Sequence, residues 1–154
     1  MGYHAAVTLA EKLTSPPNRP RVIEQCCNLV DAEVKSKGGL SGIAVKGAYG
    51  VVKAVKPKFI SEVVDGMLDE WVAKLEPFYE SWKKDAPTRT FGDYLDGRRD
   101  AAAEALLSVT DGRARVSKQG SVKKMYEKMR PSAKKHVEEA LPRLGRLIEQ
   151  EAAR

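Results

Sequence analysis

Apolar residues recur every three or four positions along nearly the whole chain, and this spacing restricts the fold more than any other feature of the sequence. The window 57–76 shows it best, because charged residues fill the opposite side of the helix that the spacing predicts. Its apolar positions are Ile60, Val63, Val64, Met67, Leu68, Trp71, Val72 and Leu75. No run alternates apolar and polar residues between turn signals, so strands are not predicted.

Capping residues, glycines and prolines set the predicted helix ends. Asn18 begins a helix that stops at Gly38 and Gly39, and another helix runs from about Ser41 to Val55.

The second half of the chain is divided by prolines. Pro77 should end or bend the 57–76 helix, and Thr90 should cap a helix that closes at Asp111 and Gly112. A short basic helix then breaks at Pro131, and Pro142 kinks or splits the last helix.

The fold class that follows is all-α: a compact bundle of about six to eight helices in which each apolar stripe packs against another helix. The length of 154 residues suits a single helical domain spanning 1–154. Residues 1–18 are predicted to be a loosely attached N-terminal segment of that domain.

Membrane-spanning and secreted classes are not favoured by the sequence. No stretch of 18 residues is free of charge, so no transmembrane segment is predicted, and the first residues lack the pattern of a secretory signal. Cys26 and Cys27 are the only cysteines and are adjacent, which is typical of a reducing compartment. A cytoplasmic location is therefore expected.

Four segments together are similar to a family of small bacterial all-helical proteins of unknown function. They are GGLSGIAVKGAYGVVKAVKP at 38–57, VVDGMLDEWVAKLEPFYESW at 63–82, FGDYLDGR at 91–98 and SAKKHVEEALPRLGRLIE at 132–149. The resemblance covers roughly residues 19–150. It implies a helical cytoplasmic protein and carries no activity, ligand or functional residue.

Charge is distributed unevenly along this basic protein, which has a net charge of +6. The segment 113–135 holds nine basic residues and one acidic residue, whereas 57–112 holds seven basic and twelve acidic residues. Clustered cations favour polyanions, so an acidic protein or a nucleic acid is the predicted partner of a non-enzymatic binding protein. The candidate polyanion-binding residues are Arg113, Arg115, Lys118, Lys123, Lys124, Lys128, Arg130, Lys134 and Lys135.

Two other interpretations of this segment stay open. Its cations can form a solvated face that pairs with the acidic 57–112 segment of the same molecule. They can also pair with that segment in a neighbouring copy, which would make the protein a homo-oligomer.

The glycine-rich segment 38–57 supports an alternative function. Gly42 and Gly47 have the spacing of a phosphate-binding loop, but the lysine and hydroxyl residue that such a loop needs are missing. Small residues here would instead let a neighbouring helix approach closely. Lys46, Lys53 and Lys56 lie on one broad face, so the alternative is a helical bundle that binds a small apolar ligand or anionic lipid.

No set of residues dictates a reaction, so we predict no catalytic residues, no cofactor and no metal. His136 and Glu139 have helical spacing but are too few for a zinc site. Asp93, Asp96 and Asp100 share a helical face, and pairing with neighbouring arginines explains them as well as a cation site does. Adjacent cysteines on a helix point about 100° apart, which disfavours a disulfide between them.

Overall fold

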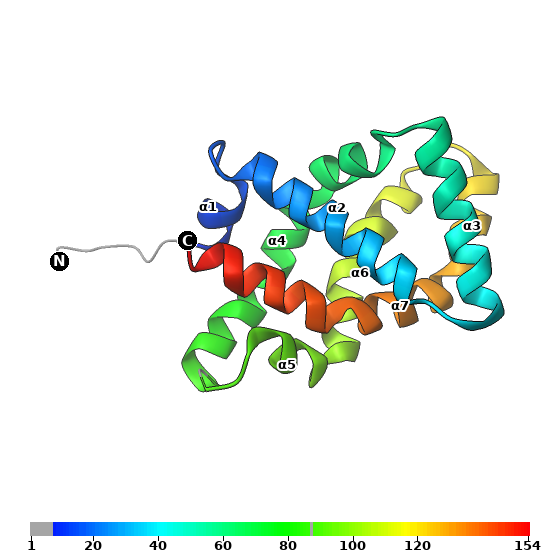
Figure 1. Ribbon diagram of the computed structural model, residues 1–154. Coiled ribbons are helices and arrows are strands. Elements are labelled where there is room, and N and C mark those ends of the chain that lie inside the picture. The colour runs from blue at the N-terminus through cyan, green and yellow to red at the C-terminus, as the bar shows by residue number, and fades with distance from the viewer. Residues whose placement is uncertain (1–7, 87) are drawn as a thin grey trace.

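The computed structural model describes residues 8–86 and 88–154, and no strand occurs among them (Figure 1). Its helices are α1 (Leu9–Thr14), α2 (Arg19–Ser36), α3 (Gly39–Val55), α4 (Phe59–Asp85), α5 (Phe91–Asp96), α6 (Arg99–Arg115) and α7 (Gly120–Ala152). Seven helices in the described residues confirm the predicted all-α fold of about six to eight helices. None of them is long and apolar enough to cross a membrane.

One buried cluster holds the bundle together, and every helix except α3 contributes to it. α7 runs beside α1, α2, α5 and α6, while α4 packs against α2 and α6 (Figure 1). The predicted stripe of α4 is confirmed, since Val64, Leu68, Val72 and Leu75 are all buried. Among the helices of the described residues, α3 contacts only α2 and α4, and it lies at one end of the molecule.

Pro77 does not end its helix, because α4 continues to Asp85, so that alternative of the prediction was wrong. Pro77 is exposed, so the carbonyl that loses its intrahelical hydrogen bond can be solvated. Beyond the proline, Trp82 stacks near Phe91 with ring centroids 5.3 Å apart and donates from Nε1 to the Arg89 carbonyl at 2.7 Å. These contacts stabilise the last turns of α4 after the proline.

α7 likewise continues through Pro131 and Pro142, so the predicted break at Pro131 and split at Pro142 were wrong. The helix is fixed to its neighbours on both sides of each proline. Arg130 and Lys134 bind carboxylates of α6, while Leu141 and Gly145 are buried against the core. Such packing outweighs the local cost of about 3 kcal/mol for a proline inside a helix.

The region predicted as one helix from Thr90 to Gly112 is two helices. The Thr90 cap is confirmed, since its Oγ1 accepts a hydrogen bond from the Asp93 amide at 3.1 Å. The first helix ends at Gly97, and α6 then continues past Gly112 to Arg115. At the start of α2, Asn18 occupies the cap position, but its side chain makes no capping hydrogen bond.

The N-terminal prediction is corrected where the structure describes the chain, and residues 1–7 lie outside the described residues. Leu9 and Leu13 of α1 are fully buried. The Glu76 carboxylate accepts hydrogen bonds from the amides of Leu9 and Ala10 at 3.0 and 3.3 Å. Residues 9–14 are therefore an integral part of the core rather than a loosely attached segment.

Close helix approach occurs at two glycines that the sequence analysis did not single out. A Cβ on Gly145 of α7 would lie 2.3 Å from the Cα of Gly92 in α5, so neither glycine leaves room for a side chain. The predicted close approach along 42–48 was wrong, because a Cβ on Gly47 would meet nothing within 4 Å. Gly42 is tight only against the backbone of Lys37, in the turn before α3.

We predict opposite effects of alanine at two helical glycines. Gly145→Ala should lower the free energy of unfolding by about 2 kcal/mol or more, because its methyl group meets the backbone of α5. Gly112→Ala, in α6 with open space around it, should raise that free energy by about 0.5–1 kcal/mol. Urea unfolding of both variants measures the two effects. Equal stability of the two would contradict the α5–α7 contact.

Candidate functional site

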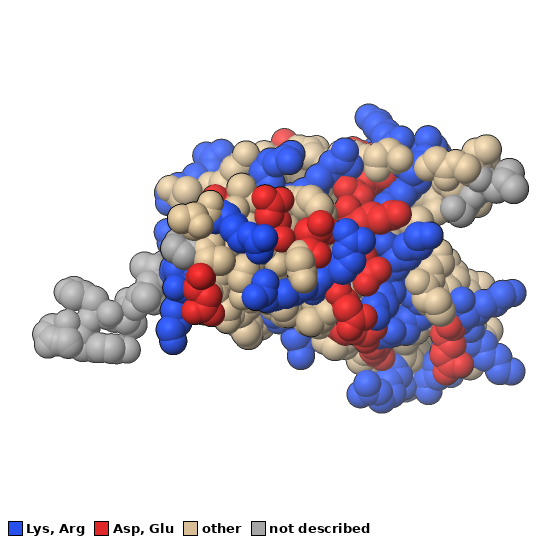
Figure 2. Space-filling view, turned by 90° about the horizontal axis from the view of Figure 1, so that it is seen from below, with Lys and Arg blue, Asp and Glu red and all other residues tan. Residues whose placement is uncertain are grey.

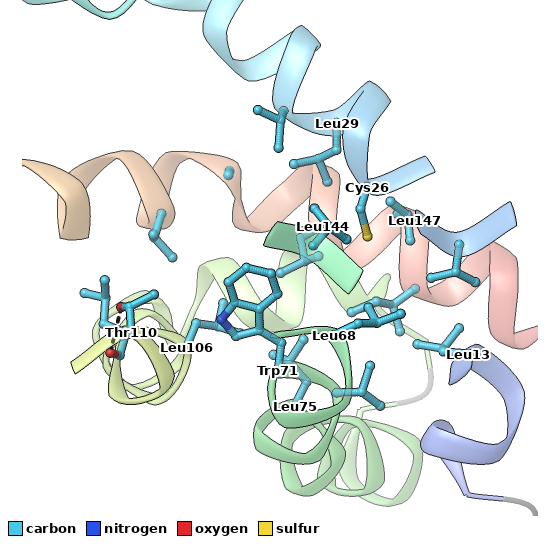
Figure 3. Close-up of a pocket in the computed structure, with 18 residues that line it drawn as sticks. Leu13, Cys26, Leu29, Leu68, Trp71, Leu75, Leu106, Thr110, Leu144 and Leu147 are labelled. Carbon is cyan, nitrogen blue, oxygen red and sulfur yellow. Dashed lines mark hydrogen bonds between the residues drawn. The ribbon is translucent and has the colours of Figure 1, made fainter. Parts of the chain in front are cut away.

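A cavity of about 250 Å³ lies inside the bundle, between α2, α4, α6 and α7 (Figure 3). Nine of its lining residues are buried and the others are partly exposed, so the cavity is not sealed from solvent. α1 and α2 contribute Leu13, Val22, Cys26, Leu29 and Val30, and α4 contributes Val64, Leu68, Trp71, Val72 and Leu75. α6 and α7 contribute Leu106, Leu107, Thr110, Val137, Ala140, Leu144, Leu147 and Ile148.

The walls of the cavity are almost entirely apolar. The Thr110 hydroxyl already donates to the Leu107 carbonyl at 3.0 Å and lies 2.8 Å from the Tyr126 hydroxyl. Trp71 stands in the middle of the lining, across from Leu29 and Leu144 (Figure 3). Because a bound water needs two to four polar contacts, this cavity favours hydrocarbon over water.

Cys26 places a thiol in the cavity wall, and its neighbour Cys27 lies outside it. Burial raises the pKa of Cys26 to about 12, with smaller contributions from Cys27 and Glu151. Burial also raises the pKa of Cys27. Both thiols are free, as predicted, and at neutral pH both are protonated, which makes them poor nucleophiles.

The sequence analysis placed the α4 residues of the lining on an apolar stripe but did not predict a cavity. Small residues offer the only sequence signal. Cys26, Thr110 and Ala140 interrupt faces that otherwise carry leucine, valine and isoleucine. At three places where the helices face one another, a short side chain leaves space unfilled.

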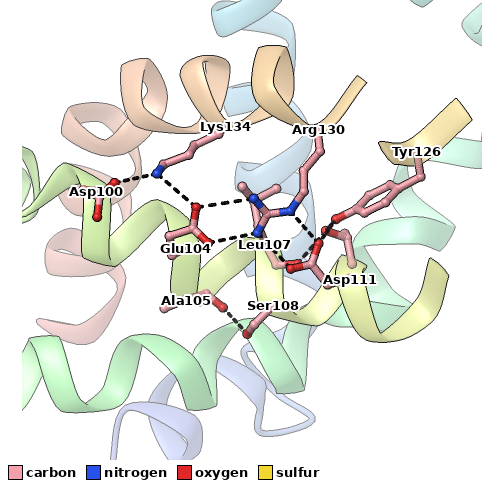
Figure 4. A network of polar contacts seen from close by, with 10 residues as sticks. Asp100, Glu104, Ala105, Leu107, Ser108, Asp111, Tyr126, Arg130 and Lys134 are labelled. Carbon is pink, nitrogen blue, oxygen red and sulfur yellow. Dashed lines mark hydrogen bonds and ion pairs between the residues drawn. The ribbon is translucent and has the colours of Figure 1, made fainter. Parts of the chain in front are cut away.

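Three of the nine predicted polyanion-binding residues form ion pairs within the molecule. Arg130 Nε and Nη2 each donate to Asp111 at 2.8 Å, and Nη2 also binds Glu104 at 3.0 Å (Figure 4). Lys134 bridges Asp100 and Glu104. Arg113 donates to Glu70 at 2.7 Å and to the Gly66 carbonyl at 2.8 Å.

These contacts perturb the carboxylates of α6. Hydrogen bonds from Arg130 and Lys134 lower the pKa of Glu104, and the hydrogen bond from Arg130 lowers the pKa of Asp111. Tyr126 donates its hydroxyl proton to Asp111, while burial raises the pKa of Tyr126. Pairing of the basic segment with the acidic 57–112 segment of the same molecule is thus present for three cations.

The other six predicted residues are exposed and form no ion pair within the described residues. They are Arg115, Lys118, Lys123, Lys124, Lys128 and Lys135. Over the face shown in Figure 2, basic and acidic side chains are mixed across the middle of the molecule. The segment therefore does not form one continuous basic surface on that face.

The remaining candidate residues do not assemble into a catalytic site. His136 Nδ1 lies 3.5 Å from Glu139, which also binds Lys37 at 2.8 Å. Asp96 pairs with Arg99 on the surface. Among the described residues, no group of three or more histidine, cysteine, aspartate or glutamate side chains could hold a metal ion.

Part of the cationic face predicted on 46–56 forms contacts within the molecule. Tyr49 donates a hydrogen bond to Asp31, and Lys53 binds the same carboxylate at 3.1 Å. Lys46 and Lys56 are exposed. α3 passes straight through Gly42 and Gly47, so these glycines form no loop around a phosphate.

An all-helical bundle with an apolar cavity defines the structural class of this protein. The chain belongs to the family described as "Family of unknown function (DUF6918)", whose model matches residues 9–152. Searches of curated proteins and of solved structures found no similar protein.

We predict that the Arg130 network stabilises the protein in a pH-dependent way. Arg130→Gln should lower the free energy of unfolding at pH 7 by about 1 kcal/mol, because Asp111 and Glu104 lose their shared cation. A carboxylate whose pKa is lowered by folding contributes this stability in full at pH values above its unfolded pKa. The higher of the two unfolded pKa values is 4.5, for Glu104. The contribution should vanish as the pH falls through the lowered pKa values of Asp111 and Glu104.

Chemical unfolding of both proteins at pH 7 and pH 3 measures this difference. Arg146→Gln is the matched control, since Arg146 is exposed on the same helix and forms no ion pair within the described residues. A difference between wild type and Arg130→Gln that persists undiminished at pH 3 would contradict the assignment.

Proposed function

We propose that this protein binds a small apolar molecule, or the hydrocarbon part of a larger one, in the cavity between α2, α4, α6 and α7. The observation that carries the proposal is a cavity of about 250 Å³ whose walls are apolar apart from three groups: the Thr110 hydroxyl, which already has a partner, the protonated Cys26 thiol and the Trp71 indole N–H. When hydrocarbon fills the cavity, apolar surface of the ligand and of the cavity wall is removed from water. This burial contributes about 25 cal/mol of binding free energy per Å².

The size of the cavity limits the ligand. An engineered apolar cavity of about 150 Å³ is known to stay dry and to bind benzene, so a larger one can hold more than a single ring. At about 30 Å³ for each water-sized group, roughly eight such groups fit. A fused aromatic system or a short alkyl chain has this size.

Binding rather than catalysis is supported by the chemistry of the walls. The cavity holds no carboxylate, histidine or lysine among its lining residues, so no general acid or base faces the ligand. The protonated Cys26 thiol is not an activated nucleophile. Two free thiols also support a cytoplasmic location as part of the proposal.

Occupancy of the cavity should be visible at Cys26. With naphthalene as the ligand, we expect saturable binding in equilibrium dialysis, and we expect the alkylation of Cys26 by N-ethylmaleimide to slow at least fivefold. Cys27 is an internal control, because it lies next to Cys26 but outside the cavity. Peptide mass spectrometry gives the rate at each thiol, and equal slowing of both would argue against binding in the cavity.

A variant that fills the cavity completes this test. Ala140→Leu adds an isopropyl group to the cavity wall and should weaken binding of the probe at least tenfold without lowering the free energy of unfolding. Ala101→Leu, on the exposed side of α6, makes the same change outside the cavity. Unchanged affinity of Ala140→Leu for the probe would contradict the proposal.

A second candidate is the binding of an acidic protein or nucleic acid through 113–135. It is supported by the six exposed cations without ion pairs in the described residues. If about five phosphates of duplex DNA are neutralised, the logarithm of the binding constant should fall against the logarithm of the salt concentration with a slope of about −4.5.

Fluorescence anisotropy of a labelled duplex at several salt concentrations measures this slope. Lys123→Gln with Lys124→Gln should make it shallower by about 2. Lys74→Gln with Lys84→Gln, on the exposed surface of α4, should leave it unchanged. A flat salt response would exclude the nucleic-acid version of this candidate.

A further inference from the structure

The exposed large apolar side chains are not scattered over the molecule. Among the described residues, all of them lie within two segments, 43–59 and 116–129. They are Ile43, Val51, Val55 and Phe59 in the first segment, and Val116, Val122, Met125 and Met129 in the second. Both segments lie at the same end of the bundle, where α3 and the first turns of α7 are found (Figure 1).

α3 carries apolar residues on both of its sides, one of which faces away from the bundle. Val45, Tyr49 and Val52 face α2 and α4 and are half-buried. On the opposite side, Ile43 is 68% exposed and Val51 is 64% exposed, with only glycines and alanines between them. An exposed helix of a globular protein normally presents polar residues on the side that faces solvent, and α3 departs from this pattern.

Cations flank this apolar face, and acidic residues are missing from it. The sequence from Val34 to Ser61 contains no aspartate or glutamate. Lys46 and Lys56 of this stretch are exposed. This stretch thus combines apolar surface with an excess of positive charge, and Glu62 follows it beside Lys56.

The start of α7 also combines exposed apolar and basic side chains, with Glu127 as the one acidic residue of 113–135. Val122, Met125 and Met129 are spaced by three and four residues and form one exposed stripe, with Met125 63% exposed. Lys123, Lys124 and Lys128 lie beside the stripe. At the right-hand end of Figure 2, lysine and arginine side chains project next to uncharged surface, with acidic side-chain atoms among them.

We propose that this end of the molecule docks on the surface of a membrane containing anionic lipids. Apolar faces of interfacial helices enter the boundary between headgroups and acyl chains, and lysines beside them bind lipid phosphates. α3 supplies the longer apolar face, and the stripe at the start of α7 supplies a second contact at the same end. The proposal goes beyond the apolar ligand, because no residue of α3 lines the cavity.

A second copy of the chain fits this surface less well. In a two-fold contact through α3, the lysines of one copy would face those of the other. The exposed face of a 17-residue helix is about 25 Å long and about 10 Å wide, or about 250 Å². A stable protein interface buries about 800 Å² on each partner.

Nucleic acid also fits this surface less well. A phosphate backbone pairs with the lysines but makes no use of exposed isoleucine, valine and methionine. Base stacking would need aromatic side chains. Phe59 is the one aromatic residue among the exposed large apolar side chains.

Co-sedimentation with vesicles tests the proposal. We expect the full chain to sediment with vesicles of phosphatidylcholine mixed with phosphatidylglycerol. With vesicles made of phosphatidylcholine only, we expect it to stay in the supernatant. Lys46→Gln with Lys56→Gln should reduce the partition coefficient roughly 25-fold, since each lysine near an anionic surface contributes about fivefold. Ile43→Ser with Val51→Ser should reduce it at least tenfold.

The control variant removes the same number of positive charges at another place on the surface. Lys74→Gln with Lys84→Gln, on the exposed surface of α4, should bind the mixed vesicles like wild type. All these variants should bind naphthalene in vesicle-free buffer like wild type, so failure of docking and failure of the cavity proposal can be told apart.

Three results would overturn the proposal. The first is no binding to mixed vesicles by a folded wild-type chain. The second is binding that Lys46→Gln with Lys56→Gln leaves unchanged. The third is a dimer in sedimentation experiments that Ile43→Ser with Val51→Ser abolishes, which would assign the surface to a second copy.

Discussion

The length of α7 is the constraint on which the rest of the structure depends. At 33 residues the helix is about 50 Å long, and its buried residues begin only at Leu141. The second half packs into the bundle, where Gly145 meets Gly92 of α5. The first half is held to α6 by the side chains of Arg130 and Lys134 instead of by a core. One helix therefore closes the cavity with one half and presents Met125 to solvent with the other.

The apolar residues of the cavity and those of the exposed end lack packing contacts for different reasons. In the cavity, leucines and valines from five helices converge, but short side chains at Cys26 and Ala140 leave the middle empty. On α3, Ile43 and Val51 have no helix to pack against because only the other side of α3 touches α2 and α4. Both features concern apolar contact, and each would be satisfied by a different hydrocarbon: a small molecule inside, lipid outside.

Local periodicity predicted most of the fold. The stripe of α4 and the cap at Thr90 followed from spacing and side-chain chemistry, which act within one or two turns. The continuous helices through Pro77, Pro131 and Pro142 did not follow, because they depend on contacts with residues far away in the sequence. The cavity could not be predicted for the same reason, because it is a volume between five helices and depends on how they pack together. The outward apolar face of α3 was visible only once its neighbours were known.

The order in which the helices leave the ribosome gives the last helix a particular importance. α2, α4 and α6 carry most of the cavity wall and are synthesised first, while Leu144, Leu147 and Ile148 come from the final turns of α7. Glu76 holds α1 from the middle of the chain, but Lys12 reaches the carbonyl of Ala152 at its far end. Until α7 emerges, the leucines of the earlier helices have no cover, so the nascent chain passes through a stage in which holding chaperones and aggregation compete for it.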